Sequence, residues 1–116
     1  MSADKTAFQQ QLGLASDLQV GTYEWQPATD RLTWSPDLIR IYGLEHAPTG
    51  ETGFSDLVHP DDRVRVEGET STYLGSETAG YSHMFRIVRP DGAVRVILDR
   101  AVIERDETGA VQRIRG

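Results

Sequence analysis

The fold class that this sequence predicts is an α+β domain built on one antiparallel sheet. Three observations support that prediction: a long hairpin pattern near the carboxyl terminus, two short strand patterns near the amino terminus, and a helical stretch between them. The 116 residues suffice for one domain with its own buried core. We take the elements in order of how strongly the sequence defines them.

The hairpin pattern runs from Tyr81 to Leu98, with β-branched and aromatic residues on both sides of Pro90-Asp91-Gly92. In such a turn proline presets φ, aspartate bonds its own backbone, and glycine accepts a positive φ. Apolar side chains fill both alternation phases, with Phe85, Ile87 and Ile97 in one and Met84, Val88, Val94, Val96 and Leu98 in the other. A sheet with one wet face is apolar in one phase only. Both faces of this hairpin are therefore expected to be covered.

The amino-terminal part is predicted to hold one helix and two short strands. Phe8, Leu12 and Ala15 recur at helical spacing, which predicts an amphipathic helix over residues 4–18. Residues 20–26 read as a strand in which Tyr23 and Trp25 alternate with polar side chains. A turn at residues 27–30 leads to a second strand, 31–34.

The middle of the chain is predicted to be helical. Ser35 can cap a helix whose first residues are Pro36 and Asp37, and Gly43 can end it. Residues 45–53 read as a loop and 54–58 as one helical turn. A further helix is expected from Pro60 to about Leu74, with a weak apolar stripe and an interruption at Gly68; the stripe consists of Val64, Thr70, Tyr73 and Leu74. A turn at 106–109 and a strand from 110 onward end the chain.

Composition excludes several function classes. The chain has no cysteine, so disulfides, thiolate metal sites, cysteine nucleophiles and cysteinyl-flavin photochemistry are absent. A net charge of −6 disfavours nucleic acid and anionic membranes. No apolar run approaches the roughly 20 residues of a membrane span, and the first residues lack the pattern of a secretory signal. We expect a soluble cytoplasmic protein.

One polar cluster can be interpreted either as a catalytic or metal site or as the start of a helix. His59 precedes Pro60, Asp61 and Asp62, a combination that superficially suggests a metal or acid–base site. Adjacent carboxylates at a helix start diverge around the helix axis. Helix initiation explains all four residues, including the proline, so no metal site is predicted.

Several short segments together carry a family resemblance. They are Gly21-Thr22-Tyr23-Glu24-Trp25, Thr33-Trp34-Ser35-Pro36, Ile41-Tyr42-Gly43-Leu44, Val58-His59-Pro60-Asp61-Asp62-Arg63, Phe85-Arg86-Ile87-Val88-Arg89-Pro90-Asp91-Gly92 and the last turn, Asp106 to Gly109. In this order and spacing the chain resembles a PAS domain, of the subtype common in bacterial sensor histidine kinases and other multidomain signalling proteins.

The resemblance implies a five-stranded antiparallel sheet in the order 2-1-5-4-3, with helices over one face. It implies an amino-terminal flanking helix at residues 1–19 and the PAS domain at 20–116, without the segment that connects such domains to an output domain. The cleft under the helices can hold a small ligand in this family, and the other sheet face commonly meets the flanking helix and a second subunit. A homodimer and an output domain of the same longer protein are the expected partners.

The residues expected in the cleft are Ile39, Tyr42, Leu57, Phe85, Ile87 and Ile97. The residues expected to face a partner are Phe8, Leu12, Met84, Val88, Val94, Val96 and Leu98. Since side chains alternate along a strand, a slip of one residue would exchange the two faces.

No cofactor is predicted. His83 shares the phase of Phe85 and could reach a ligand, but lone strand histidines are more often packed, and haem-binding relatives use a histidine on the long helix, where this chain has none after His59. Trp25 and Trp34 could stack on a flavin, although core packing is the commoner use of such residues. An unidentified small molecule stays open.

Three functions remain open at this point. The first is a sensory or regulatory domain that relays a cue to an output domain, in the first instance that of a histidine kinase. The second is a dimerisation module with no ligand, and the third is a small enzyme in which a residue such as Asp99 faces the cavity. A cavity of about 300 Å³ or more would favour sensing, and a tightly filled core would favour the module.

Overall fold

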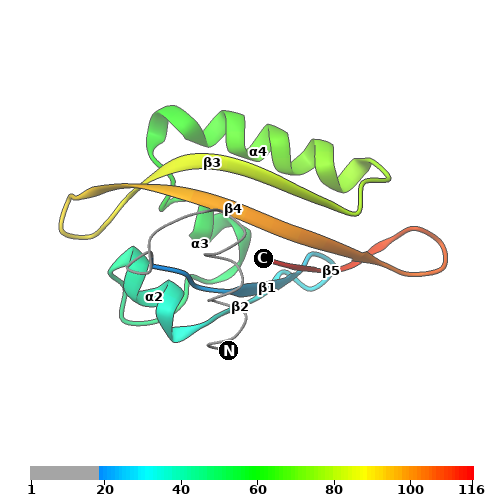
Figure 1. The fold of residues 1–116 in the computed structure, drawn as a ribbon, viewed down its shortest axis with the longest axis horizontal. Helices are drawn as coiled ribbons and strands as arrows, with labels where there is room; N and C mark the ends of the chain where they lie inside the picture. The colour runs from blue at the N-terminus through cyan, green and yellow to red at the C-terminus, as the bar shows by residue number, and fades with distance from the viewer. Residues whose placement is uncertain (1–18) are drawn as a thin grey trace.

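The computed structural model of the protein describes residues 19–116, and the helix predicted over residues 4–18 lies outside them. The described elements follow in the order β1 (Tyr23–Gln26), β2 (Arg31–Trp34), α2 (Pro36–Tyr42), α3 (Gly50–Ser55), α4 (Pro60–Gly75), β3 (Gly80–Val88), β4 (Val94–Arg105) and β5 (Val111–Arg115). Figure 1 shows this succession along the chain. The predicted α+β class is confirmed.

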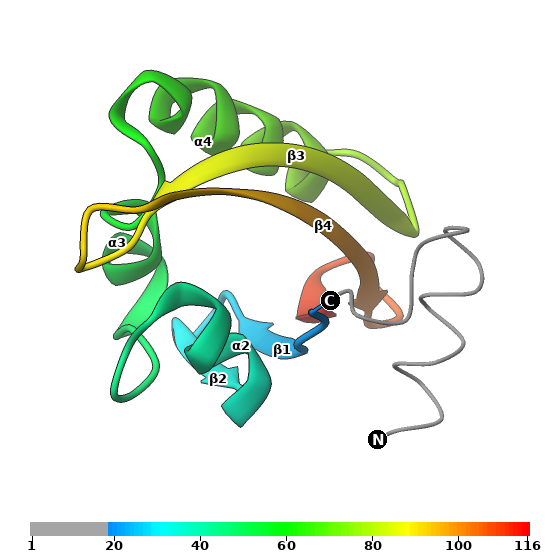
Figure 2. The ribbon, with the colours of Figure 1, turned by 60° about the vertical axis from the view of Figure 1, so that its left-hand side comes forward.

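The five strands form one antiparallel sheet in the order β2-β1-β5-β4-β3, as the family resemblance implied. The β3–β4 hairpin is its longest part, and Val88 pairs with Val94 across the Pro90-Asp91-Gly92 turn. Gly92 has a φ of 85°, a conformation that glycine adopts without a Cβ clash. The sheet is strongly curved, with β3 and β4 arched over β1 and β2 (Figure 2).

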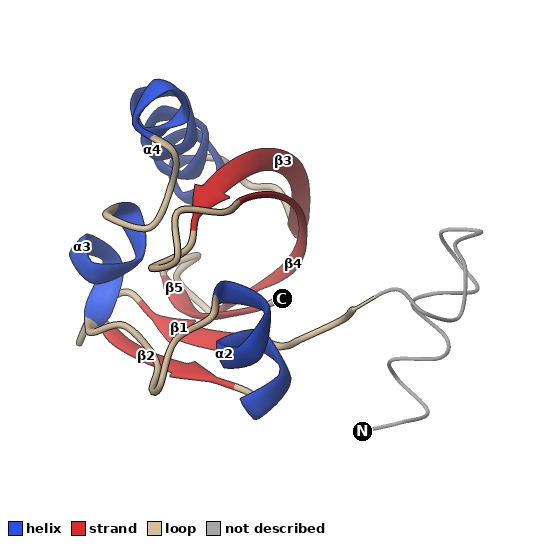
Figure 3. Cartoon of the chain, turned by 90° about the vertical axis from the view of Figure 1, so that its left-hand side faces the viewer, coloured by secondary structure: helices blue, strands red, loops and turns tan. Residues whose placement is uncertain are grey.

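The helices cover the concave face of the sheet, as Figure 3 shows for α2 and α3. Side chains from all three helices enter the same core: among them, Leu38 from α2, Phe54 from α3 and Val66 from α4 pack with Trp34 and Phe85. A second, smaller core contains Ala101, Ile103 and Ile114. The concave face therefore carries two apolar clusters, one under the helices and one near β5.

Two predicted boundaries were wrong. Strand β1 begins at Tyr23 rather than at residue 20, because its first pair is with Trp34, the last residue of β2, and Gly21 contacts α2 instead. The loop predicted over 45–53 contains the start of α3 at Gly50. There the Asp30 carboxylate accepts the backbone N–H of Glu51 at 2.9 Å. This capping contact joins residues 21 apart in the sequence, so a local pattern could not reveal it.

Helix α4 also differs from the prediction. It runs without interruption through Gly68, where an added Cβ would meet nothing within 4 Å. Val64, which was assigned to the apolar stripe, is 83% exposed, whereas Val66 is buried. Tyr73 and Leu74, which were also assigned to the stripe, pack against the second core.

Two arginine side chains join helix ends to neighbouring segments. Arg63 of α4 donates to the carbonyls of Ser55, Asp56 and Val58, at the end of α3 and just after it. Arg89, in the β3–β4 turn, donates to the Ile41 carbonyl at the end of α2. These guanidinium groups satisfy carbonyls that a helix end leaves without a partner.

Candidate functional site

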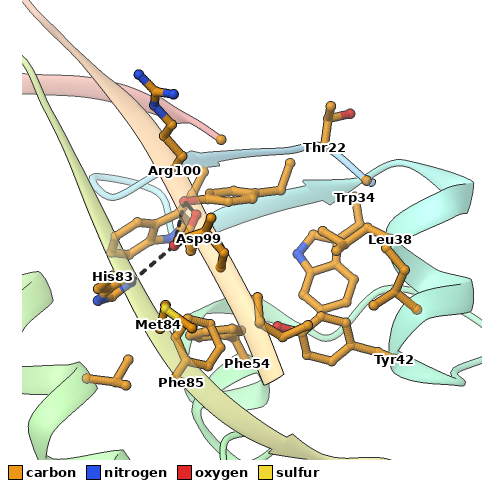
Figure 4. Close-up of a pocket in the computed structure, with 18 of the residues that line it drawn as sticks. Thr22, Trp34, Leu38, Tyr42, Phe54, His83, Met84, Phe85, Asp99 and Arg100 are labelled. Carbon is orange, nitrogen blue, oxygen red and sulfur yellow. Dashed lines mark hydrogen bonds and ion pairs between the residues drawn. The ribbon is translucent and has the colours of Figure 1, made fainter. Parts of the chain in front are cut away.

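A cavity of about 960 Å³ lies between the concave sheet face and the helices. Most of its wall is aromatic or aliphatic, and these side chains are Tyr23, Trp25, Leu32, Trp34, Leu38, Ile41, Tyr42, Phe54, Val66, Tyr81, Phe85 and Ile97. Figure 4 shows how several of them, among them Trp34, Tyr42, Phe54 and Phe85, converge from β2, α2, α3 and β3. The cavity also reaches Val96, Leu98 and Arg100, along the part of β4 that β5 does not pair with. That edge is its opening.

A polar group lies in the cavity wall between the two apolar clusters. The Tyr23 hydroxyl donates to the Asp99 carboxylate, with its oxygen 3.0 Å from Oδ1 and 3.2 Å from Oδ2. His83 Nε2 lies 3.1 Å from Asp99 Oδ2, and the two residues are directly paired across β3 and β4. Tyr81 completes the group, since its hydroxyl is 3.3 Å from that of Tyr23.

His83 connects this group to α4. Its side chain is only 4% exposed, and its second ring nitrogen, Nδ1, lies 3.4 Å from Glu69 Oε1. Glu69 in turn pairs with Arg65 at 2.7 Å, and Arg65 also donates to the Met84 carbonyl of β3. Charged groups thus run from the cavity wall to the outer side of α4.

The tyrosines of the wall experience the charge of Asp99. Burial, and after it the Asp99 carboxylate, raises the pKa of Tyr23, Tyr42 and Tyr81 above the ordinary tyrosine value. All three hydroxyls therefore stay protonated at neutral pH and serve as hydrogen-bond donors.

The six predicted cleft residues occupy two kinds of position. Tyr42, Phe85 and Ile97 lie in the cavity wall. Ile39 and Leu57 pack against the core, and Ile87 is fully buried within it, away from the wall. Ligand binding by any of the six stays a prediction, and the structure favours the first three.

The partner-facing residues lie on the convex face of the sheet. Met84, Val94, Val96 and Leu98 are 37–65% exposed there, and Val88 is partly exposed beside Val94. Val102, which the prediction omitted, extends the same surface with 58% exposure. Phe8 and Leu12 lie outside the described residues. We call the six described residues the convex apolar face; its binding to a partner stays a prediction.

The remaining candidates have structural contacts. His59 caps α4, since its Nδ1 accepts the backbone N–H of Asp61 at 3.1 Å. Asp62 does more than complement the helix dipole. It is buried and accepts the backbone and guanidinium N–H groups of Arg86, which holds the pKa of its carboxyl well below the usual range.

Within residues 19–116, no cluster of three or more His, Asp and Glu side chains has an arrangement suited to a metal ion. None of the helices in that range has both the length and the apolar composition that crossing a bilayer requires. Trp25 and Trp34 line the cavity, and Trp25 also donates its indole N–H to Asp30 at 2.9 Å.

Comparison with known proteins now identifies the family. A family model described as PAS fold matches residues 31–116. The chain belongs to the PAS fold family. It is a PAS sensory domain, and its relatives include parts of sensor kinases.

Two solved structures resemble this PAS domain closely in fold. A sensory box histidine kinase/response regulator from Burkholderia thailandensis is 28% identical, with a TM-score of 0.72 over 93% of this chain and 80% of that chain. The N-terminal domain of a diguanylate cyclase with PAS/PAC sensor from Marinobacter aquaeolei has a TM-score of 0.75 over 83% of this chain and 89% of that chain. At 17% identity, this second match shows the fold alone.

Two curated proteins match in sequence. A peroxide stress-activated histidine kinase of Schizosaccharomyces pombe is 32% identical over 101 residues, which is 84% of this chain and 6% of that protein. A methyl sulfide methyltransferase-associated sensor of Methanosarcina acetivorans is 29% identical over 75 residues, which is 65% of this chain and 8% of that protein. This PAS domain therefore spans less than a tenth of either relative.

Sequence reasoning missed the grouping of Tyr23, Tyr81, His83 and Asp99. Part of it was available, because the Pro90-Asp91-Gly92 turn defines the hairpin register and hence the pairing of His83 with Asp99. Tyr23 lies 76 residues before Asp99, and no local pattern predicts that contact.

Proposed function

We propose that this PAS domain senses a small molecule held in its cavity and relays the binding to an output domain, in the first instance that of a histidine kinase. The cavity of about 960 Å³ carries the proposal. It exceeds the roughly 300 Å³ from which ligand pockets begin, and its apolar wall with a few convergent polar groups is typical of them. A ligand-free module would need a core that fills this space.

The relay would act through the elements that surround the cavity. Leu38 and Tyr42 of α2, Phe54 of α3 and Val66 of α4 all border it, so a ligand changes how these helices pack on the sheet. A ligand shifts such an equilibrium only as far as it binds the two arrangements differently. The contacts from Asp99 through His83 and Glu69 connect the cavity with α4.

The nature of the output domain rests on the relatives. A histidine kinase of Schizosaccharomyces pombe and a histidine kinase/response regulator of Burkholderia thailandensis both contain a matching segment. We therefore assign the domain to a cytoplasmic two-component signalling protein, and a bacterial source is consistent with the subtype. A diguanylate cyclase is the next candidate, on fold alone.

A second function, homodimerisation, is favoured by a separate observation. The convex apolar face exposes Met84, Val94, Val96, Leu98 and Val102 together on two neighbouring strands. Contiguous apolar surface of this kind marks interaction sites in soluble proteins. Met84, Val96 and Leu98 also border the cavity, whereas Val94 and Val102 do not, so the dimer is best tested at the latter two. A small enzyme, the third alternative, finds no support in the relatives, and a turnover screen on the purified domain is its test.

Native mass spectrometry of the protein as purified, followed by denaturation of the same sample, tests both functions together. A mass excess that disappears on denaturation is the expected sign of a retained ligand, and a doubled mass is the sign of the dimer. Ile97→Trp fills the cavity and should remove the excess while the dimer persists. Val102→Asp, which lies on the convex face and outside the cavity wall, should split the dimer while the excess persists.

Two results together would contradict sensing: the wild type carries no excess mass, and Ile97→Trp has the same free energy of unfolding as the wild type. In that case filling the cavity displaces no ligand. A monomer at all concentrations would contradict the dimer and leave the sensing proposal intact.

A further inference from the structure

The charge and shape of the cavity also indicate what it binds, an inference that rests on the sensing function proposed above. We propose that the ligand is a protonated amine carried on an aromatic or apolar body, and that Asp99 is its counter-ion. The argument has three parts: the charge balance around Asp99, the free bonding capacity of its carboxylate, and the chemistry of the wall.

Asp99 belongs to a wall in which carboxylates outnumber guanidinium groups: Asp37, Glu51, Glu67 and Asp99 line the cavity, against Arg95 and Arg100. Within residues 19–116, the ion-pair partner of Asp99 is His83, and that ring also faces the carboxylate of Glu69. Arg65 pairs with Glu69, and Arg86 pairs with Asp62. Asp99 therefore shares its imidazole partner with a second carboxylate. A buried charge is costly unless it is well paired, so a cation that binds beside Asp99 gains more than it would in water.

The carboxylate of Asp99 can still accept hydrogen bonds. An ionised carboxylate has about four acceptor sites, and the described contacts are those with the Tyr23 hydroxyl and His83 Nε2. The Asp99 side chain is 12% exposed and lines the cavity, where Figure 4 shows it in the middle of the wall. An ammonium group at this point would complete its coordination.

The rest of the wall suits the body and charge of such a ligand. Trp34 and Tyr42, with ring centroids 4.5 Å apart, and Phe54 and Phe85, 5.8 Å apart, form an aromatic enclosure. Aromatic faces attract cations as well as apolar groups. At the α3 end, Glu67 also lines the cavity. The pKa of Glu51 is raised first by burial, then by the charge of Asp30 and then by that of Glu67.

Two arginines also line the cavity. Arg95 is exposed and lies four residues before Asp99 on β4, about 13 Å along an extended strand. This is the separation of their Cα atoms, and because the Arg95 side chain is exposed, solvent weakens its interaction with Asp99. Arg100 belongs to the opposite alternation phase of the strand.

The test uses matched probes that differ in one group. Tryptamine, 3-propylindole and indole-3-propionate share a ring and carry a cationic, neutral or anionic end, and the corresponding phenyl and naphthyl series vary the size of the body. Affinities are measured by calorimetry at neutral pH and low salt. In at least one series the amine should bind about tenfold or more tightly than its neutral partner, the order expected of one charge-assisted hydrogen bond.

Three variants locate the effect. Asp99→Asn keeps the size and an acceptor for Tyr23, and it should abolish the preference for the amine. Glu107→Gln removes the same charge from the exposed β4–β5 turn and should leave the preference unchanged. Tyr23→Phe removes a donor from Asp99 and keeps the carboxylate, so the preference should be retained or increased; it also guards against a folding defect in Asp99→Asn.

The outcomes separate this inference from the sensing function. Binding of neutral or anionic probes as tightly as the amine in every series, or an amine preference that survives Asp99→Asn, would overturn the amine and leave a sensing cavity in place. An absence of binding by any probe, with no retained mass in the native spectrum, would overturn both.

Discussion

The faces of the β3–β4 hairpin can be tested by comparing Ile87→Ala with Val96→Ala. Ile87 is fully buried and Val96 is 65% exposed, and they lie on opposite faces of neighbouring strands. Truncating Ile87 removes three buried carbons, which costs about 2.4 kcal/mol in transfer free energy. The space left behind raises the expected loss of unfolding free energy to about 3–4 kcal/mol. Truncating Val96 should cost less than about 1 kcal/mol, mainly through lost strand preference.

Urea unfolding followed by tryptophan fluorescence measures both losses, because Trp25 and Trp34 report on the cavity wall. The two variants should share one denaturant slope, since the surface exposed on unfolding is nearly the same. Repeating the titration at several protein concentrations separates monomer stability from any effect of Val96 on a dimer. Equal losses, or a larger loss for Val96→Ala in the monomer, would refute the assignment of the faces.

Three further outcomes follow from local contacts. Asp62→Asn should weaken the loss of unfolding free energy at acid pH. The Arg86 contacts lower the folded-state pKa of Asp62, so its contribution to stability is complete above about pH 4 and is lost as the pH falls below that value. Urea unfolding from pH 7 to pH 2 measures this, and the same dependence of unfolding free energy on pH in the variant and the wild type would contradict it. Gly21→Ala should lower the melting temperature, because the new Cβ would lie 2.5 Å from that of Leu38, whereas an unchanged melting temperature would show that α2 moves freely. Ser35→Ala should cost about 1 kcal/mol in urea unfolding, since its hydroxyl caps α2 by accepting the N–H of Leu38; a loss near zero would mean that water replaces the cap.

The sequence predicted most of the fold correctly because its signals are local. The Pro90-Asp91-Gly92 turn and the alternation beside it defined the β3–β4 hairpin, and the caps at Ser35 and His59 located the starts of α2 and α4. The same reasoning failed at α3, whose first turn depends on Asp30. It failed again in α4, where only the packed helix shows that Val66 rather than Val64 is buried.

The candidate site divides in the same way. Alternation alone placed Phe85 and Ile97 on one face and Val96 on the other, since the period of a strand leaves only two possibilities. Tertiary structure decided which face the helices cover, that a cavity remains beneath them, and that Tyr23 meets Asp99 inside it. These features depend on how separate elements pack, and the free energy of packing is shared among residues far apart in the chain. The sequence by itself therefore determined the elements and their faces, and the curved sheet under its helices decided the site.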